Sequence, residues 1–319
     1  MHSRFRHRVL SRCLVAIAAG LACGACIYDY PDKDCVEPGS GLRVVFDWSA
    51  DPTAAPEGMS TLFYPVGGGD YWQYELPLEG GVAGVPDGEY NIVCFNNDTS
   101  SILFENQDDY DKALVTTRAA RLTDGFSTDY PYSQPPRRGA EASQPVVAAP
   151  DVVWGGSRGR FRIDGNDTLL VLHPAPLVAR YTVTVTHVVN IESASQVSMA
   201  LSGFSAGRML STSDMIPVDV TVPASMRRTG VDTLGGWMLA FGRDDDAPRC
   251  LLSIYVMFRD GTRKVYEYDV TGIVDNAPDP LDVHIPIEGL EFPEVDTSSG
   301  TGMEVGVDDW DVVEIELST

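Results

Sequence analysis

The sequence is poor in positive charge. It carries 23 Lys and Arg against 46 Asp and Glu, and its formal net charge is −23. Proteins that bind nucleic acid present a basic surface, and a basic patch is also what attracts a protein to anionic lipid headgroups. The charge balance therefore argues against both kinds of binding, and we expect no nucleic-acid partner.

Histidine and the common catalytic motifs are scarce as well. Outside the first 25 residues the only histidines are His173, His187 and His284, and they lie far apart in the sequence. This part of the chain has no phosphate-binding glycine loop, zinc-protease motif, nucleophile elbow or Cys-x-x-Cys pair. His187 falls on the apolar face of a predicted strand, which favours a core or edge role over a ligand role. We expect no catalytic residue, no metal site and no cofactor.

Three acidic clusters occupy predicted loops, at residues 108–111, 244–246 and 308–311. None has the Asp-x-Asp-x-Asp-Gly spacing of a calcium-binding loop, so solvated loops of an acidic protein are the favoured interpretation. A glycosidase needs two carboxylates that converge in a cleft. This third class of function stays open, because no local pattern selects a pair.

Apolar and turn-forming residues are abundant. Apolar residues make up 44% of the chain, including 13 Tyr, 11 Phe and 5 Trp, which is too much core material for a disordered acidic protein. The 30 Gly and 21 Pro indicate frequent turns and disfavour long helices. A chain of 319 residues is also long enough for two domains. The composition predicts an acidic, folded, β-rich protein.

The first 25 residues differ from the rest of the chain. A basic stretch without acidic residues precedes the apolar segment Cys13–Ala25. This segment is shorter than the roughly 20 residues that a membrane-spanning helix needs, so it is typical of an export signal. The basic residues of the stretch are Arg4, Arg6, Arg8 and Arg12.

The end of this segment, Gly24-Ala25-Cys26, resembles the lipobox of bacterial lipoproteins. In that family the signal is cut just before a diacylated cysteine, which forms the new N-terminus. The resemblance implies that residues 1–25 are a lipoprotein signal peptide and that Cys26 is the lipid attachment site. Cys23 is a competing site, and an ordinary cleaved signal without lipid is the other alternative. The acidic, proline-broken residues 26–40 are interpreted as a tether.

Three cysteines remain after processing, namely Cys35, Cys94 and Cys250. An odd number without close spacing does not predict a disulfide framework. Cys94 and Cys250 fall on apolar faces of predicted strands, and no histidine is near either of them in the sequence. We interpret both as small buried residues rather than as reactive thiols.

Strands are predicted wherever apolar and polar residues alternate. Only residues 108–121 permit a helix. The register of one hairpin can be predicted, because a three-residue loop at Arg259-Asp260-Gly261 pairs Ile254 with Tyr266 and keeps acidic residues off the core face. The predicted strands include 42–48, 62–64, 71–76, 90–95, 181–189, 197–201, 250–258, 281–287 and 312–317.

The segment 129–150 interrupts this pattern with five prolines and small residues. Its composition predicts an exposed connection, and we expect the domain boundary near its end. The expected domains are 41–150, which carries the connection at its end, and 151–319.

Several short segments carry a family resemblance, and the turn Pro86–Tyr90 that leads into a strand resembles prealbumin-like modules. The segments are Cys26–Pro31, Leu42–Trp48, Pro56–Met59, Gly88–Asp98, Ala179–Tyr181, Leu201–Gly203 and Val305–Trp310. They resemble a family of gut-bacterial lipoproteins related to fimbrillin-type anchor proteins. The resemblance implies an all-β fold of two transthyretin-like (prealbumin-like) β-sandwich domains, and lipid attachment to the outer membrane with exposure at the cell surface.

The resemblance also implies a role as a fimbrial anchor or accessory subunit, with fimbrial subunits as partners and no enzymatic activity. The alternative is a glycan- or protein-binding surface lipoprotein that is not linked to fimbriae, for which exposed aromatic residues on one sandwich face would be the sign. For a fimbrial role, the candidate docking edges are the regions that border the Gly/Ser-rich hinge 297–302 and the terminal strand 312–317. The terminal strand either pairs within its own domain, as terminal strands usually do, or is exchanged with a partner.

We expect Cys26→Ser to abolish acyl labelling and to move the protein from the membrane to the soluble fraction. Two acyl chains hold a protein stably at a membrane, and removing their attachment site removes that affinity. Metabolic labelling with a palmitate analogue and cell fractionation measure both effects. Cys23→Ser is the control, and labelling that depends on Cys23 instead would contradict the assignment.

Overall fold

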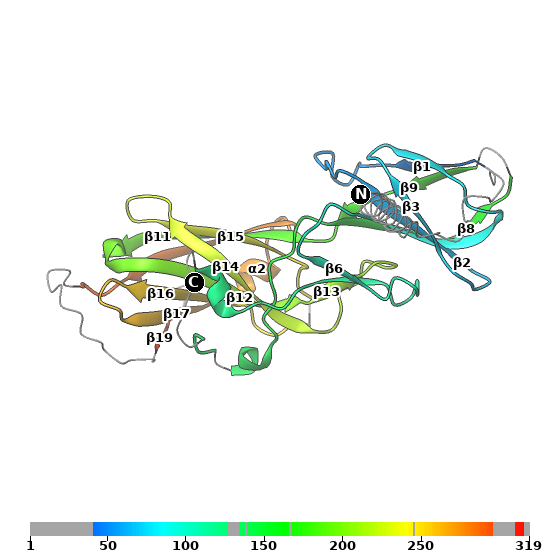
Figure 1. Cartoon of the computed structure of the whole chain (residues 1–319). Helices are drawn as coiled ribbons and strands as arrows, with labels where there is room; N and C mark the ends of the chain where they lie inside the picture. The colour runs from blue at the N-terminus through cyan, green and yellow to red at the C-terminus, as the bar shows by residue number, and fades with distance from the viewer. Residues whose placement is uncertain are drawn as a thin grey trace, which may run out of the picture. The chain divides into compact units, whose positions relative to one another are not determined.

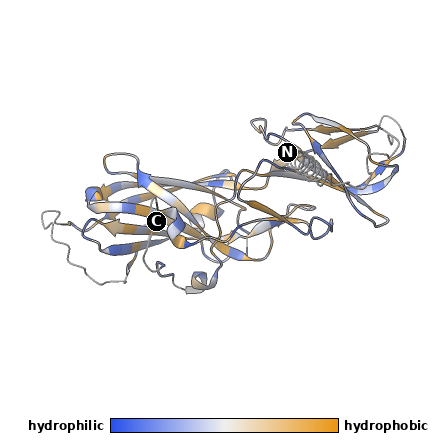
Figure 2. Cartoon of the chain, in the orientation of Figure 1, coloured by the Kyte–Doolittle hydropathy of each residue, from blue (hydrophilic) through white to orange (hydrophobic). Residues whose placement is uncertain are grey.

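Almost all of the regular structure in the described residues is β-strand, arranged in four sheets (Figure 1). The computed structural model describes residues 41–126, 134–137, 139–165, 168–244, 246–295 and 310–315. These residues belong to one compact unit, Ser40–Thr319. Along the strands, apolar and polar residues alternate in many places (Figure 2). The all-β sandwich fold expected from the sequence is confirmed.

Two of the sheets pack face to face. Their strands are β1 (Leu42–Phe46), β2 (Met59–Pro65), β3 (Trp72–Leu76), β4 (Gly80–Ala83), β5 (Gly88–Asn96), β8 (Trp154–Ile163), β9 (Leu169–Leu172) and β10 (Ala175–Pro176). The smaller sheet has the order β4-β1-β9, and the larger one has the order β10-β8-β5-β2-β3. Phe46 of the smaller sheet and Phe63 and Tyr90 of the larger one lie in one buried core, so the pair forms a β-sandwich.

The third sheet has eight strands, in the order β18-β11-β15-β14-β12-β16-β17-β19. Strands from both sides of it, represented by Tyr181, Ile254 and Ile285, bury alternate residues in a single core. Phe292, which follows the edge strand β18, packs against Tyr266 of β17, with ring centroids 5.6 Å apart. A sheet that buries one face in one core in this way folds over on itself. The strands are β11 (Ala179–Val189), β12 (Ala194–Ser205), β14 (Asp219–Arg228), β15 (Leu234–Ala240), β16 (Leu251–Phe258), β17 (Arg263–Asp269), β18 (Asp282–Glu291) and β19 (Asp311–Glu314).

A small fourth sheet, of order β13-β7-β6, lies against the outer face of the five-stranded sheet. Val115 of this small sheet shares a buried cluster with Val93 of β5 and with Phe241. The prediction that residues 108–121 permit a helix is wrong, because residues 114–117 form a strand that pairs with β6 and β13. The remaining elements are β6 (Ile102–Glu105), β7 (Leu114–Thr117), β13 (Gly207–Met209), the 3₁₀ helices η1 (Leu122–Gly125), η2 (Gly139–Ser143) and η3 (Ile191–Ser193), and the helix α2 (Thr271–Asp275).

Strand pairing places the change between the sheets after β10. β8 pairs with β5, so that Gly156 is opposite Cys94, and β9 pairs with β1, so that Leu170 is opposite Val44. The first strand of the eight-stranded sheet, β11, begins at Ala179, later in the chain than the boundary expected at residue 150. The division into two domains that fold independently stays a prediction.

The predicted register of the β16–β17 hairpin is confirmed. Ile254 is opposite Tyr266, and Leu252 is opposite Tyr268. Gly261, the last residue of the three-residue loop, has a φ of 88°, which favours glycine over residues with a side chain. β18, which contains Pro286, is an edge strand as expected.

The predicted position of His187 on the apolar face is wrong. Its φ is 55°, and the facing β18 has Gly289 at a φ of 77°. These two left-handed residues interrupt the alternation, so that Val188 is buried and the side chain of His187 is 68% exposed. A simple period of two cannot anticipate such a bulge.

The interpretation of 129–150 as an exposed connection is also wrong for the residues that are described. Gln144 Oε1 accepts hydrogen bonds from the Gly203 N–H and the Thr221 hydroxyl, both at 3.2 Å. Val146 pairs with Thr221, and Arg137 donates to the Gln144 carbonyl at 2.6 Å. The segment therefore lies on the eight-stranded sheet. We name residues 119–126, 134–137 and 139–149 the covering segment.

We expect Gly125→Ala to lower the free energy of unfolding by about 1–3 kcal/mol through overpacking. A Cβ at this position of the covering segment would lie 2.5 Å from the Ala224 carbonyl oxygen and 3.1 Å from the Ser198 Cβ. Gly67→Ala is the matched control, because a Cβ there meets nothing within 4 Å. Urea unfolding measures both variants, and equal stabilities would contradict the close packing of the segment.

Candidate functional site

The predicted lipid attachment site, Cys26, and the tether 26–40 lie outside the described residues. Lipid attachment therefore stays a prediction. None of the helices that are described is long and apolar enough to cross a membrane.

Two of the remaining cysteines are buried in the sandwich cores. Cys94 and Cys250 are both fully buried, and burial raises the pKa of each thiol to about 12. Neither thiol is ionised at neutral pH, whereas a cysteine nucleophile has to be a thiolate. The structure therefore agrees with their interpretation as packing residues.

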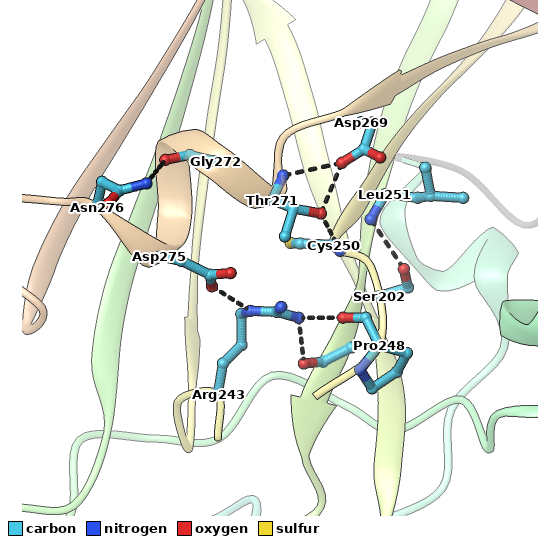
Figure 3. A network of polar contacts seen from close by, with 11 residues as sticks. Ser202, Arg243, Pro248, Cys250, Leu251, Asp269, Thr271, Gly272, Asp275 and Asn276 are labelled. Carbon is cyan, nitrogen blue, oxygen red and sulfur yellow. Dashed lines mark hydrogen bonds and ion pairs between the residues drawn. The ribbon is translucent and has the colours of Figure 1, made fainter. Parts of the chain in front are cut away.

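The polar network beside Cys250 holds irregular backbone in place (Figure 3). Arg243, whose side chain is 5% exposed, donates from one nitrogen to the carbonyls of Gly203 and Pro248, each at 2.8 Å. Its Nε lies 2.8 Å from a carboxylate oxygen of Asp275 in α2. Gly203 interrupts β12 with a φ of 78°. The network thus joins an interruption of the sheet to α2, which is a structural role.

The histidines do not converge on a common site. His173 lies 3.2 Å from Asp47, and His284 lies 3.1 Å from the Thr184 hydroxyl. The pKa of the Asp47 carboxyl is lowered, mainly because the carboxylate accepts a hydrogen bond from the backbone N–H of Ser49. Within the described ranges, no three His, Cys, Asp or Glu side chains are grouped so that they could hold a metal ion.

The acidic cluster 108–111 behaves as a loop. The Asp109 carboxylate lies 2.6 Å from the Lys112 ammonium and accepts the backbone N–H of Asp111 at 3.0 Å. The hydrogen bond from Lys112 is the main cause that lowers the pKa of Asp109. The cluster 308–311 lies mostly outside the described residues, and so does Asp245 of the cluster 244–246.

The terminal strand pairs within the eight-stranded sheet of its own chain. β19 adds to β17 in parallel, with Val312 opposite Val265, and the Ile315 N–H donates to the Glu267 carbonyl at 3.0 Å. Trp310, just before β19, packs its ring edge-on against Tyr255, with centroids 5.8 Å apart. The edge is therefore occupied by a four-residue strand that the chain itself supplies.

The outer face of the eight-stranded sheet is divided into a covered part and an open part. Over β12, β16 and β17, Leu122 and Phe126 of the covering segment bury Tyr255 and Val265, together with Trp310. Over β11 and β15 the face is open, and with neighbouring residues of β14 it forms a groove of about 830 Å³. We name it the Trp237 groove, after the tryptophan of β15 that lines it and is 53% exposed.

Polar and apolar residues both line the groove around Trp237, among them Leu239 and Pro223. Thr182 is directly opposite it on β11, and Arg227 on β14 is opposite Gly235. The Arg180 guanidinium lies over the indole ring, 4.5 Å from its centroid. Sequence reasoning missed this groove, although Trp237 is out of phase with the core residues Leu234 and Met238 of its strand, which was a usable signal.

Comparison with known proteins adds sequence relatives. Residues 27–225 match a protein family described as a domain of unknown function, DUF5119. A protein of Bacteroides ovatus, described as a candidate fimbrium anchoring subunit, Fim4B, is 35% identical over 136 residues, which are 42% of this chain and 36% of that protein. The match thus spans about a third of the length of this curated relative. The resemblance to fimbrial anchor proteins noted in the sequence is confirmed.

Solved structures share the fold. A candidate adhesin from Bacteroides ovatus superposes with a TM-score of 0.61 at 20% identity, over 81% of this chain and 94% of that chain. A candidate polysaccharide-binding protein from Bacteroides thetaiotaomicron superposes with a TM-score of 0.51 at 9% identity, over 78% of this chain and 90% of that chain. At these identities the likeness establishes the fold alone. The family match at residues 27–225 covers more than half of this chain, so the chain belongs to the DUF5119 family.

Proposed function

We propose that the protein is a lipid-anchored surface protein of the outer membrane that acts as an anchor or accessory subunit of a fimbria. The relative described as a fimbrium anchoring subunit supports this role, which is structural rather than enzymatic. The lipobox-like Gly24-Ala25-Cys26 supports the lipid anchor. The partners are then the membrane, reached through diacylated Cys26, and a fimbrial subunit.

The observation that carries the proposal is the β17 edge with its short terminal strand. Main-chain hydrogen bonds to an exposed sheet edge are a general way for one protein to receive a strand from another. In the part of the chain that is described, β19 supplies four residues to β17 by parallel pairing. Parallel pairing is slightly less stable per residue than antiparallel pairing. A partner strand therefore displaces β19 at modest cost and gains the same edge.

Trp310 gives this exchange a defined side-chain site. Its ring lies between Tyr255 and Phe126, at 5.8 Å and 6.4 Å between centroids. Tyr255 itself is buried at the floor of the site. A partner strand that replaces β19 brings an apolar residue to the same place, since leaving it empty would cost the packing of the whole cluster.

We expect deletion of the gene to release fimbriae into the medium or to change their length, because the base of the fibre loses its attachment. A strain that expresses Cys26→Ser is expected to show the same phenotype, since the subunit is then no longer held at the membrane. Electron microscopy of cells and immunoblots of the medium measure both effects. Fimbriae that stay on the cells in both strains would contradict the proposal and favour a surface protein without a link to fimbriae.

A second test locks β19 in place. Lys264 is opposite Asp311, and Lys264→Cys with Asp311→Cys is expected to form a disulfide in the oxidising cell envelope. The locked strand cannot leave β17, so the locked strain is expected to release fimbriae as the deletion strain does. Electron microscopy and a gel-shift assay for free thiols measure the two effects.

The matched control is Thr186→Cys with Glu288→Cys, a parallel pair between β11 and β18 at the other side of the sheet. The control and both single Lys264 and Asp311 variants are expected to keep their fimbriae. Attached fimbriae in the fully locked strain would show that the β17 edge is not the docking site, even if the deletion strain confirms the anchor role.

A further inference from the structure

The chain at β19 carries apolar residues on both faces of the strand. Trp310 and Val312 pack with the cluster beneath the covering segment, while Val313 and Ile315 pack against the core of the eight-stranded sheet. All four residues are half-buried. An edge strand with one face in water would alternate apolar and polar residues instead. β19 is therefore built like an interior strand, although it is the last in the order of its sheet.

The covering segment is the reason for the second apolar face. Leu122 and Phe126 of this segment belong to one cluster with Val265 of β17, and Val265 is opposite Val312. A strand on the β17 edge thus meets the core on one side and the covering segment on the other. A polar residue on either side would be buried without a hydrogen-bond partner, which costs free energy.

The covering segment and β16 also form a slot for one aromatic ring. The Tyr255 ring meets the Trp310 ring edge-on, with centroids 5.8 Å apart and an interplanar angle of 81°. The Phe126 ring lies 6.4 Å from the Trp310 ring on a tilt of 32°. Aromatic pairs in such arrangements are more stable than their buried area alone accounts for. Tyr255 is 1% exposed, so the packing of the sheet fixes the floor of the slot.

The main chain of β17 fixes the register of the strand beside it. Tyr266 is opposite Val313, and the Ile315 N–H donates to the Glu267 carbonyl at 3.0 Å. A slip of one residue would turn every side chain of the strand to the opposite face and move the aromatic ring out of the slot. The order of the apolar positions along an incoming strand is thereby specified.

We propose that the β17 edge selects a parallel partner strand with the pattern aromatic-x-aliphatic-aliphatic-x-aliphatic. The aromatic residue takes the place of Trp310 between Tyr255 and Phe126. The first aliphatic residue packs beneath the covering segment, and the other two reach the core. This inference rests on the proposed function, which assigns the edge to a fimbrial partner, and it makes the covering segment part of the surface that recognises that partner.

Disulfide trapping tests this selection in the full chain. The acceptor carries Lys264→Cys together with Trp310→Ala and Val312→Ala, which weaken the packing of the chain's own strand. The probe is the peptide Trp-Cys-Val-Val-Glu-Ile, whose cysteine stands at the position of Asp311, opposite position 264. We expect saturable formation of a disulfide between the acceptor and the peptide, measured by mass spectrometry. Peptide mapping locates the disulfide, and the same chain without Lys264→Cys controls for the other cysteines.

Two further peptides test the side-chain pattern. Ala-Cys-Val-Val-Glu-Ile lacks the aromatic ring, and Ser-Cys-Thr-Val-Glu-Ile keeps only the apolar residues that face the core. Both are expected to need at least tenfold higher concentrations for half-maximal trapping. Phe126→Ala in the acceptor removes one wall of the slot, so the preference for tryptophan over alanine is expected to fall several-fold.

Val82→Ala in the acceptor is the matched control, because Val82 is 70% exposed on β4, in the other sandwich. This variant is expected to keep the full preference for tryptophan. Thermal midpoints equal to that of the acceptor show that the Phe126→Ala and Val82→Ala variants are folded.

Equal trapping of all three peptides would overturn the selection, and a preference that Phe126→Ala leaves unchanged would overturn the role of the covering segment. The absence of any trapped peptide would overturn strand uptake at β17, whereas release of fimbriae by the deletion strain would still support the anchor role. Disulfide-linked dimers in a mixture of Lys264→Cys and Asp311→Cys chains would identify a second copy of this chain as the occupant instead.

Discussion

The structure depends on a single constraint, which is that eight strands bury one face in one core. Tyr181, Ile254 and Ile285 come from strands that are far apart in the sheet order and still share that core. The sheet must therefore fold over, and its whole outer face turns away from the core. An apolar outer face in water is costly, so the chain has to cover it with its own residues or keep it polar. The covering segment covers the outer face over β14, β12, β16 and β17, whereas the face over β11 and β15 carries more polar residues and stays open.

The covered part explains a segment that the composition misrepresents. The prolines and small residues of 129–150 predict an exposed connection. In the structure, the Gln144 side chain accepts hydrogen bonds from the Gly203 N–H and the Thr221 hydroxyl. Arg137 donates a hydrogen bond to the Gln144 carbonyl of the same segment. Buried backbone and amide groups need partners, and these partners lie far away in the sequence. A proline-rich stretch that packs in this way satisfies its polar groups through tertiary contacts, which no local pattern reports.

The same distinction separates what could be predicted from what could not. The alternation of β1 and the register of the β16–β17 hairpin follow from local pattern and turn chemistry, because one residue of slip would turn Tyr266 away from the core. The bulge at His187 and the assignment of β8 to the first sandwich depend on contacts with Gly289 and β5, across long stretches of chain. The Trp237 groove needed both kinds of information. Its tryptophan is visibly out of phase in the sequence, but the groove exists only because the covering segment ends beside it.

The arrangement of the sheet also keeps the Trp237 groove and the β17 edge apart. The strands that line the Trp237 groove are separated from β17 by β12 and β16, which lie beneath the covering segment. A strand exchanged at the β17 edge replaces Trp310 and Val312, and neither of these residues lines the groove. A substitution of Trp237 therefore leaves the β17 edge in place, whereas displacement of β19 removes the Trp310 contact of Phe126 and so reaches the wall of the groove at Asp124.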